Sequence, residues 1–152
     1  MRLRDEMERV VRGELAPPPV ATLLGISLAS FKDGEAVVTL AAGDSHTNPM
    51  GTVQGGVLAA LADGAMGWAY MTTLGEGESY TTLEMKINFL RPVWKGTLTA
   101  IARIKKGGKT VGLVECDVAD AEGNLAAYAV STQMTLRGAQ AAGRRPAVAF
   151  AR

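Results

Sequence analysis

Residues 54–71 of the chain read QGGVLAALADGAMGWAYM, and this segment decides the fold. It is apolar on all sides except at Asp63, and Val57 is its only β-branched residue. Because β-branched residues favour strands, the segment is expected to be a helix in spite of its four glycines. A helix with no polar face has to be wrapped by a sheet or lie between subunits.

The residues before this helix predict a shorter helix and then a break. Apolar side chains form one stripe along residues 3–11, a charged segment that stops at Gly13. Three prolines, Pro17 to Pro19, then prevent the helix from continuing. One further turn of helix is expected at residues 21–24.

Turn residues and alternating patterns divide the rest of the chain into strands. Asp33-Gly34 and Gly107-Gly108 are typical of β-hairpins, and residues 120–123 predict a third turn. Apolar and polar side chains alternate from residue 83 to residue 89, as in a strand with one face in water. The expected strands are 26–31, 35–40, 83–89, 97–105, 109–119 and 124–136, the last four forming an antiparallel meander.

The order of these elements indicates one α+β domain. Two strands precede the long helix and four follow it, so the helix is expected to pack across a strongly curved antiparallel sheet. The 152 residues fit a single domain at 20–136. Residues 1–19 are expected to form an N-terminal helix and a proline-rich linker, and residues 137–152, which show no period, a flexible tail.

The composition points to a small-molecule partner. Lys and Arg number 16 against 15 Asp and Glu, a net charge of +1, so bulk charge gives no reason to expect binding to nucleic acid or to a membrane. The single cysteine cannot form an internal disulfide, and the chain shows neither a signal-peptide pattern nor a long apolar span. We therefore expect a cytoplasmic protein.

Three motifs occur in the order and at the spacing of a known family. They are Asn48-Pro-Met-Gly51-Thr-Val-Gln54-Gly55-Gly56, then Ala60-Leu-Ala-Asp63, then Thr82-Leu-Glu84-Met-Lys-Ile87-Asn-Phe-Leu-Arg91-Pro92 with Gly96. Over roughly residues 20–136 the chain resembles the PaaI-like acyl-CoA thioesterases of the hotdog fold, the type found in phenylacetic acid degradation.

The resemblance implies hydrolysis of an acyl-CoA thioester to the free acid and CoA. The acyl groups that it implies are phenylacetyl-like, other aryl or medium-chain groups, and no cofactor is expected. It also implies a homodimer in which the start of the long helix in one protomer lies beside the acid of the other, with dimers pairing into a homotetramer. Metal catalysis lacks ligands, since the chain has one His and one Cys.

Thioester hydrolysis needs hydrogen-bond donors that point at the oxyanion formed from the carbonyl oxygen. It also needs a group that attacks the carbonyl carbon or activates a water to attack it. Gly55 and Gly56 lie where the long helix begins, so their N–H groups lack intrahelical acceptors and no side chain blocks a substrate. Asp63 is the candidate carboxylate, either as general base on water or as a nucleophile that forms a mixed anhydride. The sequence leaves this choice open.

The spacing of these groups predicts how the active site is assembled. Gly55 and Asp63 are eight residues apart, which is about 12 Å along a helix. One carbonyl group cannot contact both. If both act on it, they come from different chains, and the active site lies at a dimer interface.

Each candidate also has a structural interpretation. Asp63 is functional or else a structural acid that bonds to backbone or caps a kink in the helix. We favour function mostly because of the resemblance, and also because a buried carboxylate is costly without a partner. Asn48 closes a turn before a proline or, as the resemblance implies, orients the water or holds the acid. Thr82, expected on the same strand face as Glu84, is a simple strand former or, as the resemblance implies, lies near the attacking water, and Thr81 competes for that place.

Gln54 departs from the family, which usually has His before the two glycines. Its amide can hydrogen-bond but cannot act as an acid or a base. His46 is expected to brace its loop, and Cys116, on one strand face with Val114 and Val118, is expected in the core. A Ser-His or Cys-His mechanism is therefore poorly supported.

The phosphates of CoA need cations near the mouth of the pocket. Arg91, at a strand end, is one candidate, although charged residues near hairpins are usually solvated edges. Arg103, Lys105, Lys106 and Lys109 are the other candidates. The predicted substrate-binding set is Gln54, Gly56, Thr82 and Arg91. Met50, Met66 and Met71 line an acyl channel or fill the core.

Two other functions are alternatives to the enzyme. A hotdog module can bind or sense acyl-CoA without turnover, but a sensor needs an output domain, and the first 25 residues are too short and proline-broken for a helix-turn-helix. A dehydratase needs a catalytic His beside the helix, which this chain lacks. The sequence therefore predicts a thioesterase with Asp63, Gly55 and Asn48 as its catalytic residues.

Overall fold

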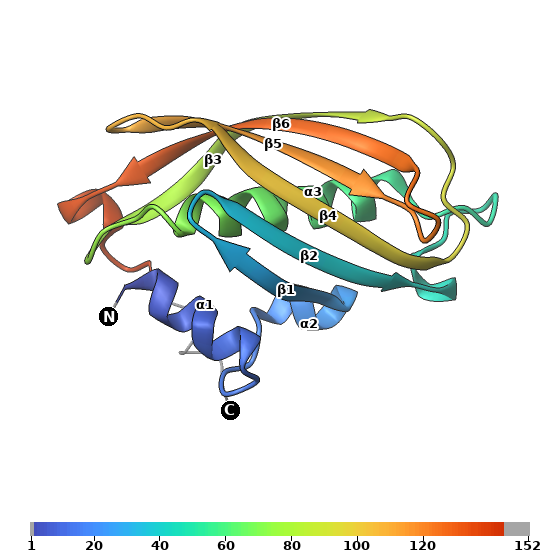
Figure 1. The fold of residues 1–152 in the computed structure, drawn as a ribbon, viewed down its shortest axis with the longest axis horizontal. Helices are drawn as coiled ribbons and strands as arrows, with labels where there is room; N and C mark the ends of the chain where they lie inside the picture. Colours follow the sequence, from blue (N-terminus) through green and yellow to red (C-terminus); the bar gives the residue numbers. More distant parts are fainter. Residues whose placement is uncertain (1, 145–152) are drawn as a thin grey trace.

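Residues 2–144, which the computed structural model describes, form a six-stranded antiparallel sheet that curves around one long helix (Figure 1). The α+β class and the helix wrapped by a curved sheet are thus confirmed. The elements are α1 (Leu3–Val11), α2 (Pro19–Leu24), β1 (Ile26–Lys32), β2 (Glu35–Ala42), η1 (Asp44–His46), α3 (Gly55–Met71), β3 (Ser79–Phe89), β4 (Gly96–Lys106), β5 (Val111–Ala119), β6 (Leu125–Leu136) and η2 (Gly138–Ala141).

The strand order is β1-β2-β4-β5-β6-β3, so the expected meander of the last four strands is wrong for β3. The short turns between β4, β5 and β6 make these strands neighbours, whereas β3 pairs with β6 at the far edge of the sheet. The connection from β3 to β4 contains Pro92, which cannot donate to a strand ladder. It spans the width of β5 and β6 (Figure 1).

Helix α3 packs its apolar side chains against the concave face of the sheet. Leu61, Ala62 and Met66 are fully buried, as are Val38 and Leu98 of the strands opposite. The helix contacts all six strands, and most extensively β2, β4 and β5. Burial of this large apolar area supplies the main driving force for the fold.

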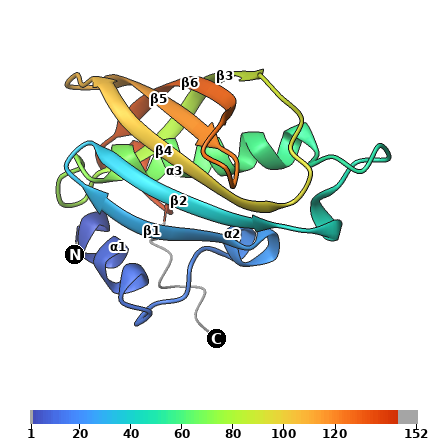
Figure 2. The same ribbon diagram turned by 45° about the vertical axis from the view of Figure 1, so that its right-hand side comes forward.

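The opposite side of α3 is only partly covered. Helix α1 packs on β1 and on α3, and α2 packs on β1 (Figure 2). Gly56 and Asp63 are exposed in the single chain, so the sheet covers one side of α3 and leaves an open flank on the other. No helix among residues 2–144 has the length and hydropathy needed to cross a membrane.

A β-bulge interrupts β3 at Leu83. Thr82 pairs with Gln133 and Glu84 pairs with Thr132. A step of two residues along β3 therefore corresponds to a step of only one residue along β6. Because side chains alternate between the faces of a strand, Thr82 and Glu84 point to opposite faces of the sheet. The expectation that they share a face is therefore wrong, and the extra residue is the reason.

The C-terminal segment is described as far as Arg144. After β6 the chain forms η2, and the Arg144 guanidinium donates to the Tyr80 carbonyl at 2.9 Å. Arg137 donates to Glu78 at 2.6 Å. Half of the predicted flexible tail at 137–152 lies outside the described residues, because 145–152 are not among them.

Candidate active site

The start of α3 presents one free backbone donor. Gln54 is the N-cap, and its side-chain oxygen accepts from the Gly56 N–H. The Gln54 carbonyl accepts from Val57 at 2.9 Å. Within the described chain no acceptor lies on the Gly55 N–H, which leaves it to a ligand at the positive end of the helix dipole. Gly55 is thus the better placed of the two glycines as an oxyanion donor.

The ring of Phe89 lies directly beside Gly55. A Cβ atom at Gly55 would be 3.0 Å from Phe89 Cζ, so glycine permits the close approach of the aromatic ring. Phe89 ends β3 and is 54% exposed. An apolar ring therefore borders Gly55 on the side where other residues carry Cβ.

Asp63 lies two turns further along α3, on its open flank. The carboxylate is exposed, so the premise that it is buried without a partner is wrong. Its Oδ1 atom accepts a hydrogen bond of 3.0 Å from Thr82 Oγ1 on β3. The Thr82–Asp63 contact connects two of the predicted site residues, and Thr82 rather than Thr81 faces the acid.

Thr82 also contacts a buried polar pair that the sequence reading missed. Its Oγ1 lies 3.1 Å from Gln133 Oε1, and Gln133 Nε2 donates to Ser131 Oγ at 2.9 Å. The single hydroxyl proton of Thr82 serves the Asp63 and Gln133 oxygens in turn. Gln133 and Ser131 are fully buried on the inward face of β6, and polar residues at inward positions of a strand were the available signal.

The loop before α3 is fixed by its own side chains. Asn48 Oδ1 accepts from the N–H groups of Met50 at 3.0 Å and Thr52 at 3.2 Å, and its Nδ2 donates to Thr52 Oγ1 at 2.8 Å. Asn48 therefore closes its turn, and the structure does not bring its amide to Asp63 within one chain. His46 accepts from Gly43 N–H at 3.0 Å and bonds the Leu24 carbonyl at 2.8 Å, which confirms its bracing role.

Tyr80 packs against α3 on the same side as Asp63. A Cβ atom at Gly67 would lie only 2.2 Å from the Tyr80 hydroxyl oxygen, so the helix needs glycine at this position. Burial, and then the nearby Asp63 charge, raise the pKa of Tyr80 to about 12. Tyr80 therefore stays protonated at neutral pH and does not act as a base.

The remaining candidates lie apart from this cluster. Arg91 forms an ion pair of 3.6 Å with Asp120 beyond the end of β3. Cys116 is fully buried, as expected, and burial raises the pKa of its thiol to about 12. Residues 2–144 contain no cluster of His, Cys, Asp or Glu side chains able to hold a metal ion.

Known proteins that are similar to this chain include thioesterases. A family model described as the thioesterase superfamily matches residues 50–127. The acyl-coenzyme A thioesterase PaaI of Escherichia coli is 34% identical over 99 residues, 64% of this chain and 69% of that protein. Human acyl-coenzyme A thioesterase 13 is 29% identical over 110 residues, 71% of this chain and 78% of that protein.

A solved structure extends the match beyond sequence. The E. coli PaaI protein from the phenylacetic acid degradation operon superposes with a TM-score of 0.78 at 27% identity, and the alignment covers 90% of this chain and 97% of that one. The resemblance seen in the motifs is therefore confirmed. The chain belongs to the thioesterase superfamily and is a thioester hydrolase with the hotdog fold.

Proposed function

We propose that the chain hydrolyses acyl-CoA thioesters to free acid and CoA at a site built by two copies of the chain. The observation that carries this proposal is the placement of Gly55 and Asp63 on one continuous helix, with the N–H of the first and the carboxylate of the second both open. Eight residues of helix keep them about 12 Å apart within a chain. The names of the relatives supply the acyl-CoA substrate class.

The reaction divides between these two groups. As the thioester carbonyl carbon is attacked, its oxygen becomes an anion, and the Gly55 N–H of one protomer donates to it. Asp63 of the other protomer either takes a proton from the attacking water or attacks the carbonyl itself to give a mixed anhydride that water then cleaves. In both routes the C–S bond breaks and CoA leaves as a thiolate that takes up a proton.

The edge strand β3 is the proposed contact between the two copies. It pairs with β6 on one side, and its other side has no strand partner within residues 2–144. An unpaired edge presents a row of backbone donors and acceptors, which a second copy of the same strand can complete. Leu83 and Phe89 are more than half exposed on this strand, and dimer contact would cover them. Pairs of such dimers would form the proposed tetramer.

The other predicted residues take supporting roles in this proposal. Thr82 orients Asp63, Asn48 fixes the loop that leads into α3, and Gln54 holds Gly56 so that Gly55 alone faces the substrate. Arg91 is the proposed phosphate ligand, and a phosphate of CoA would compete with Asp120 for its guanidinium. Phenylacetyl-like, other aryl and medium-chain acyl groups are the proposed substrates, and the cytoplasm is the proposed location.

Release of the CoA thiol tests this function directly. A panel of acyl-CoA esters, including phenylacetyl-CoA, is offered to the protein, and thiol is followed with Ellman's reagent, which buried Cys116 does not disturb. We expect Asp63→Asn to lower kcat at least about a hundredfold, the usual scale of acid–base catalysis. Equal turnover by Asp63→Asn would contradict the role of Asp63. If the parent protein and Asp63→Asn both bind the esters and neither cleaves them, the proposed hydrolysis of acyl-CoA is contradicted.

A further inference from the structure

We propose that the acyl group binds in the pocket between α1, α2 and the open flank of α3, in the same chain that supplies Asp63, and that Gly64 and α1 limit its length. This inference rests on the proposed function and deepens it. It assigns the N-terminal helix, which the motifs of the family do not include, to substrate selection.

The pocket has the size and the lining that an acyl group needs. Its volume is about 380 Å³, near the lower end of ligand pockets, which suits one acyl group and not a whole acyl-CoA molecule. Met7 and Val10 of α1 form one wall, and Trp68 and Met71 of α3 form the other. Asp63 lies on the α3 wall, so a carbonyl beside its carboxylate directs its hydrocarbon into this apolar space.

The polar groups of the pocket are few. Tyr80 lines it beside Asp63, and burial, followed by the Asp63 charge, raises the pKa of its hydroxyl to about 12, so this group is neutral. Glu6 is a second acid in the lining, and its side chain is 3% exposed. An apolar pocket with the Asp63 carboxylate on its wall favours a neutral hydrocarbon or aryl group over an acyl chain that ends in a carboxylate.

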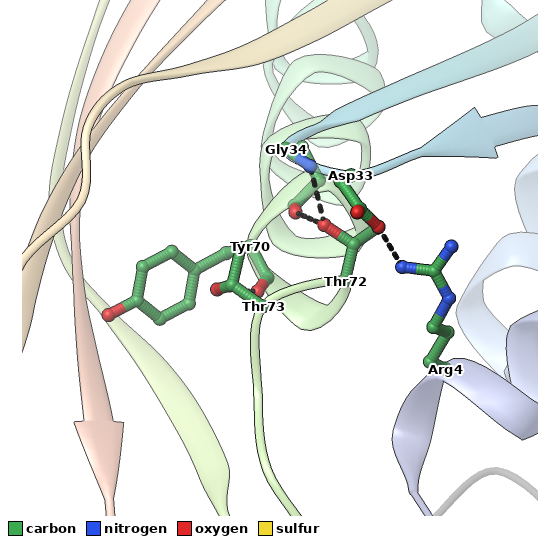
Figure 3. A network of polar contacts seen from close by, with 7 residues as sticks. Arg4, Asp33, Gly34, Tyr70, Thr72 and Thr73 are labelled. Atoms are coloured by element: carbon green, nitrogen blue, oxygen red, sulfur yellow. Dashed lines mark hydrogen bonds and ion pairs between the residues drawn. The ribbon is translucent and has the colours of Figure 1, made fainter.

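Helix α1 is held in place as a wall by polar contacts at its start. Arg4 forms an ion pair with Asp33 in the β1–β2 turn, and its guanidinium lies 5.6 Å from the centre of the Phe31 ring. In the same turn the Gly34 N–H donates to Thr72 Oγ1 at 2.8 Å (Figure 3). One turn thus connects α1 to the end of α3, so the two walls of the pocket keep a fixed separation.

Gly64 is the residue that keeps the pocket open. Glycine in the middle of a helix costs about 0.5–1 kcal/mol relative to alanine, and nothing lies within 4 Å of a Cβ atom built there. No close packing therefore requires glycine at this position. Gly64 lines the pocket next to Asp63, and any larger side chain would project into the space that the acyl group is proposed to fill.

Filling the pocket from either wall tests the proposal. We compare kcat/KM for acetyl-, hexanoyl-, octanoyl-, lauroyl- and phenylacetyl-CoA in Gly64→Leu, in Val10→Trp and in Val11→Trp. Val11 adjoins Val10 on α1 but is 41% exposed and does not line the pocket, so it provides the matched control. We expect the octanoyl-to-acetyl ratio to fall at least about tenfold in Gly64→Leu and Val10→Trp, and to stay unchanged in Val11→Trp.

The outcomes separate this inference from the function on which it rests. If the parent protein cleaves none of the esters, the proposed function fails. If the parent cleaves them and both filled variants, folded by circular dichroism, keep the parent's profile, the pocket assignment is overturned. A ratio that falls equally in Val11→Trp would also overturn it, because the effect would then come from α1 as a whole and not from the pocket.

Discussion

The Thr82 hydroxyl donates to the Asp63 carboxylate across 3.0 Å and so joins the edge strand β3 to the middle of α3. The bulge at Leu83 makes this contact possible, because it turns Thr82 toward the helix while the rest of β3 stays in register with β6. One carboxylate oxygen of Asp63 is thereby oriented, and the other is left for water or substrate.

Removal of this hydroxyl tests its positioning role. We expect Thr82→Val, which keeps the shape of the side chain, to lower kcat about tenfold with little change in KM, since a hydrogen bond to a charged group contributes about 1.5–3 kcal/mol and this one is partly in water. Thr82→Ser restores the donor and should recover most of the rate. A parental kcat in Thr82→Val, measured by thiol release, would show that Asp63 needs no such orientation.

Two glycines of α3 should respond in opposite directions to the same substitution. A Cβ atom at Gly64 meets open space, so Gly64→Ala should stabilise the protein by about 0.5–1 kcal/mol. A Cβ atom at Gly67 would lie 2.2 Å from the Tyr80 hydroxyl, so Gly67→Ala should destabilise it by about 1–3 kcal/mol. Urea unfolding measures both, and a loss of stability in Gly64→Ala would show that another group already occupies that space.

The cap at the start of α3 makes a separate prediction. Gln54→Ala removes the acceptor of the Gly56 N–H and should lower the free energy of unfolding by about 0.5–2 kcal/mol, a fall in Tm of a few degrees for a domain of this size. Asn is a strong N-cap residue, so Gln54→Asn should lower the free energy of unfolding by less than Gln54→Ala does. Equal Tm values for the parent and Gln54→Ala in a thermal scan would mean that the cap contributes nothing.

The buried thiol predicts how stability depends on alkaline pH. Burial raises the pKa of Cys116 from 9.0 to about 12 and that of Tyr80 from 10.0 to about 12. The unfolded chain therefore loses these protons first, so stability is complete below about pH 9 and declines up to about pH 12. Cys116→Ala should remove the part of the decline that begins near pH 9. Urea unfolding at a series of pH values measures this decline. If the free energy of unfolding falls equally steeply with pH in the parent and in Cys116→Ala, the raised pKa of Cys116 is contradicted.

The central helix and the strands were predictable because local patterns encode them. Residues 54–71 contain one β-branched residue, Val57, and α3 formed within one residue of its expected bounds. The alternation from residue 83 onward predicted β3 and its end at residue 89, but the strand begins four residues earlier, at Ser79. The place of β3 at the sheet edge was not predictable, because strand pairing depends on contacts between residues far apart in the chain.

The site was predictable only in part. The motif order identified Gly55, Asp63 and Thr82, but the bulge that turns Thr82 toward Asp63 leaves no mark in an alternating pattern. Gln133 was missed because it lies on the last strand, far from the motifs. The stripe of α1 showed that one face is buried, and the structure alone shows that this face lines a pocket beside Asp63.

The most direct test of the shared site is complementation between two inactive chains. Gly55→Pro removes the N–H at the first position of α3, where proline is tolerated and the extended Gln54 already suits a following proline. Gly55→Ala keeps the N–H and controls for the new contact with Phe89. Alone, Gly55→Pro and Asp63→Asn should each lose about a hundredfold or more in kcat, and Gly55→Ala should lose much less.

When the two inactive variants exchange subunits, each mixed dimer regains one site, with Asp63 from the Gly55→Pro chain and the Gly55 N–H from the Asp63→Asn chain. An equal mixture should therefore recover about a quarter of the parental activity, since half of the dimers are mixed and half of their sites are intact. No recovery, with subunit exchange demonstrated, would place both groups of each site in one chain and contradict the account.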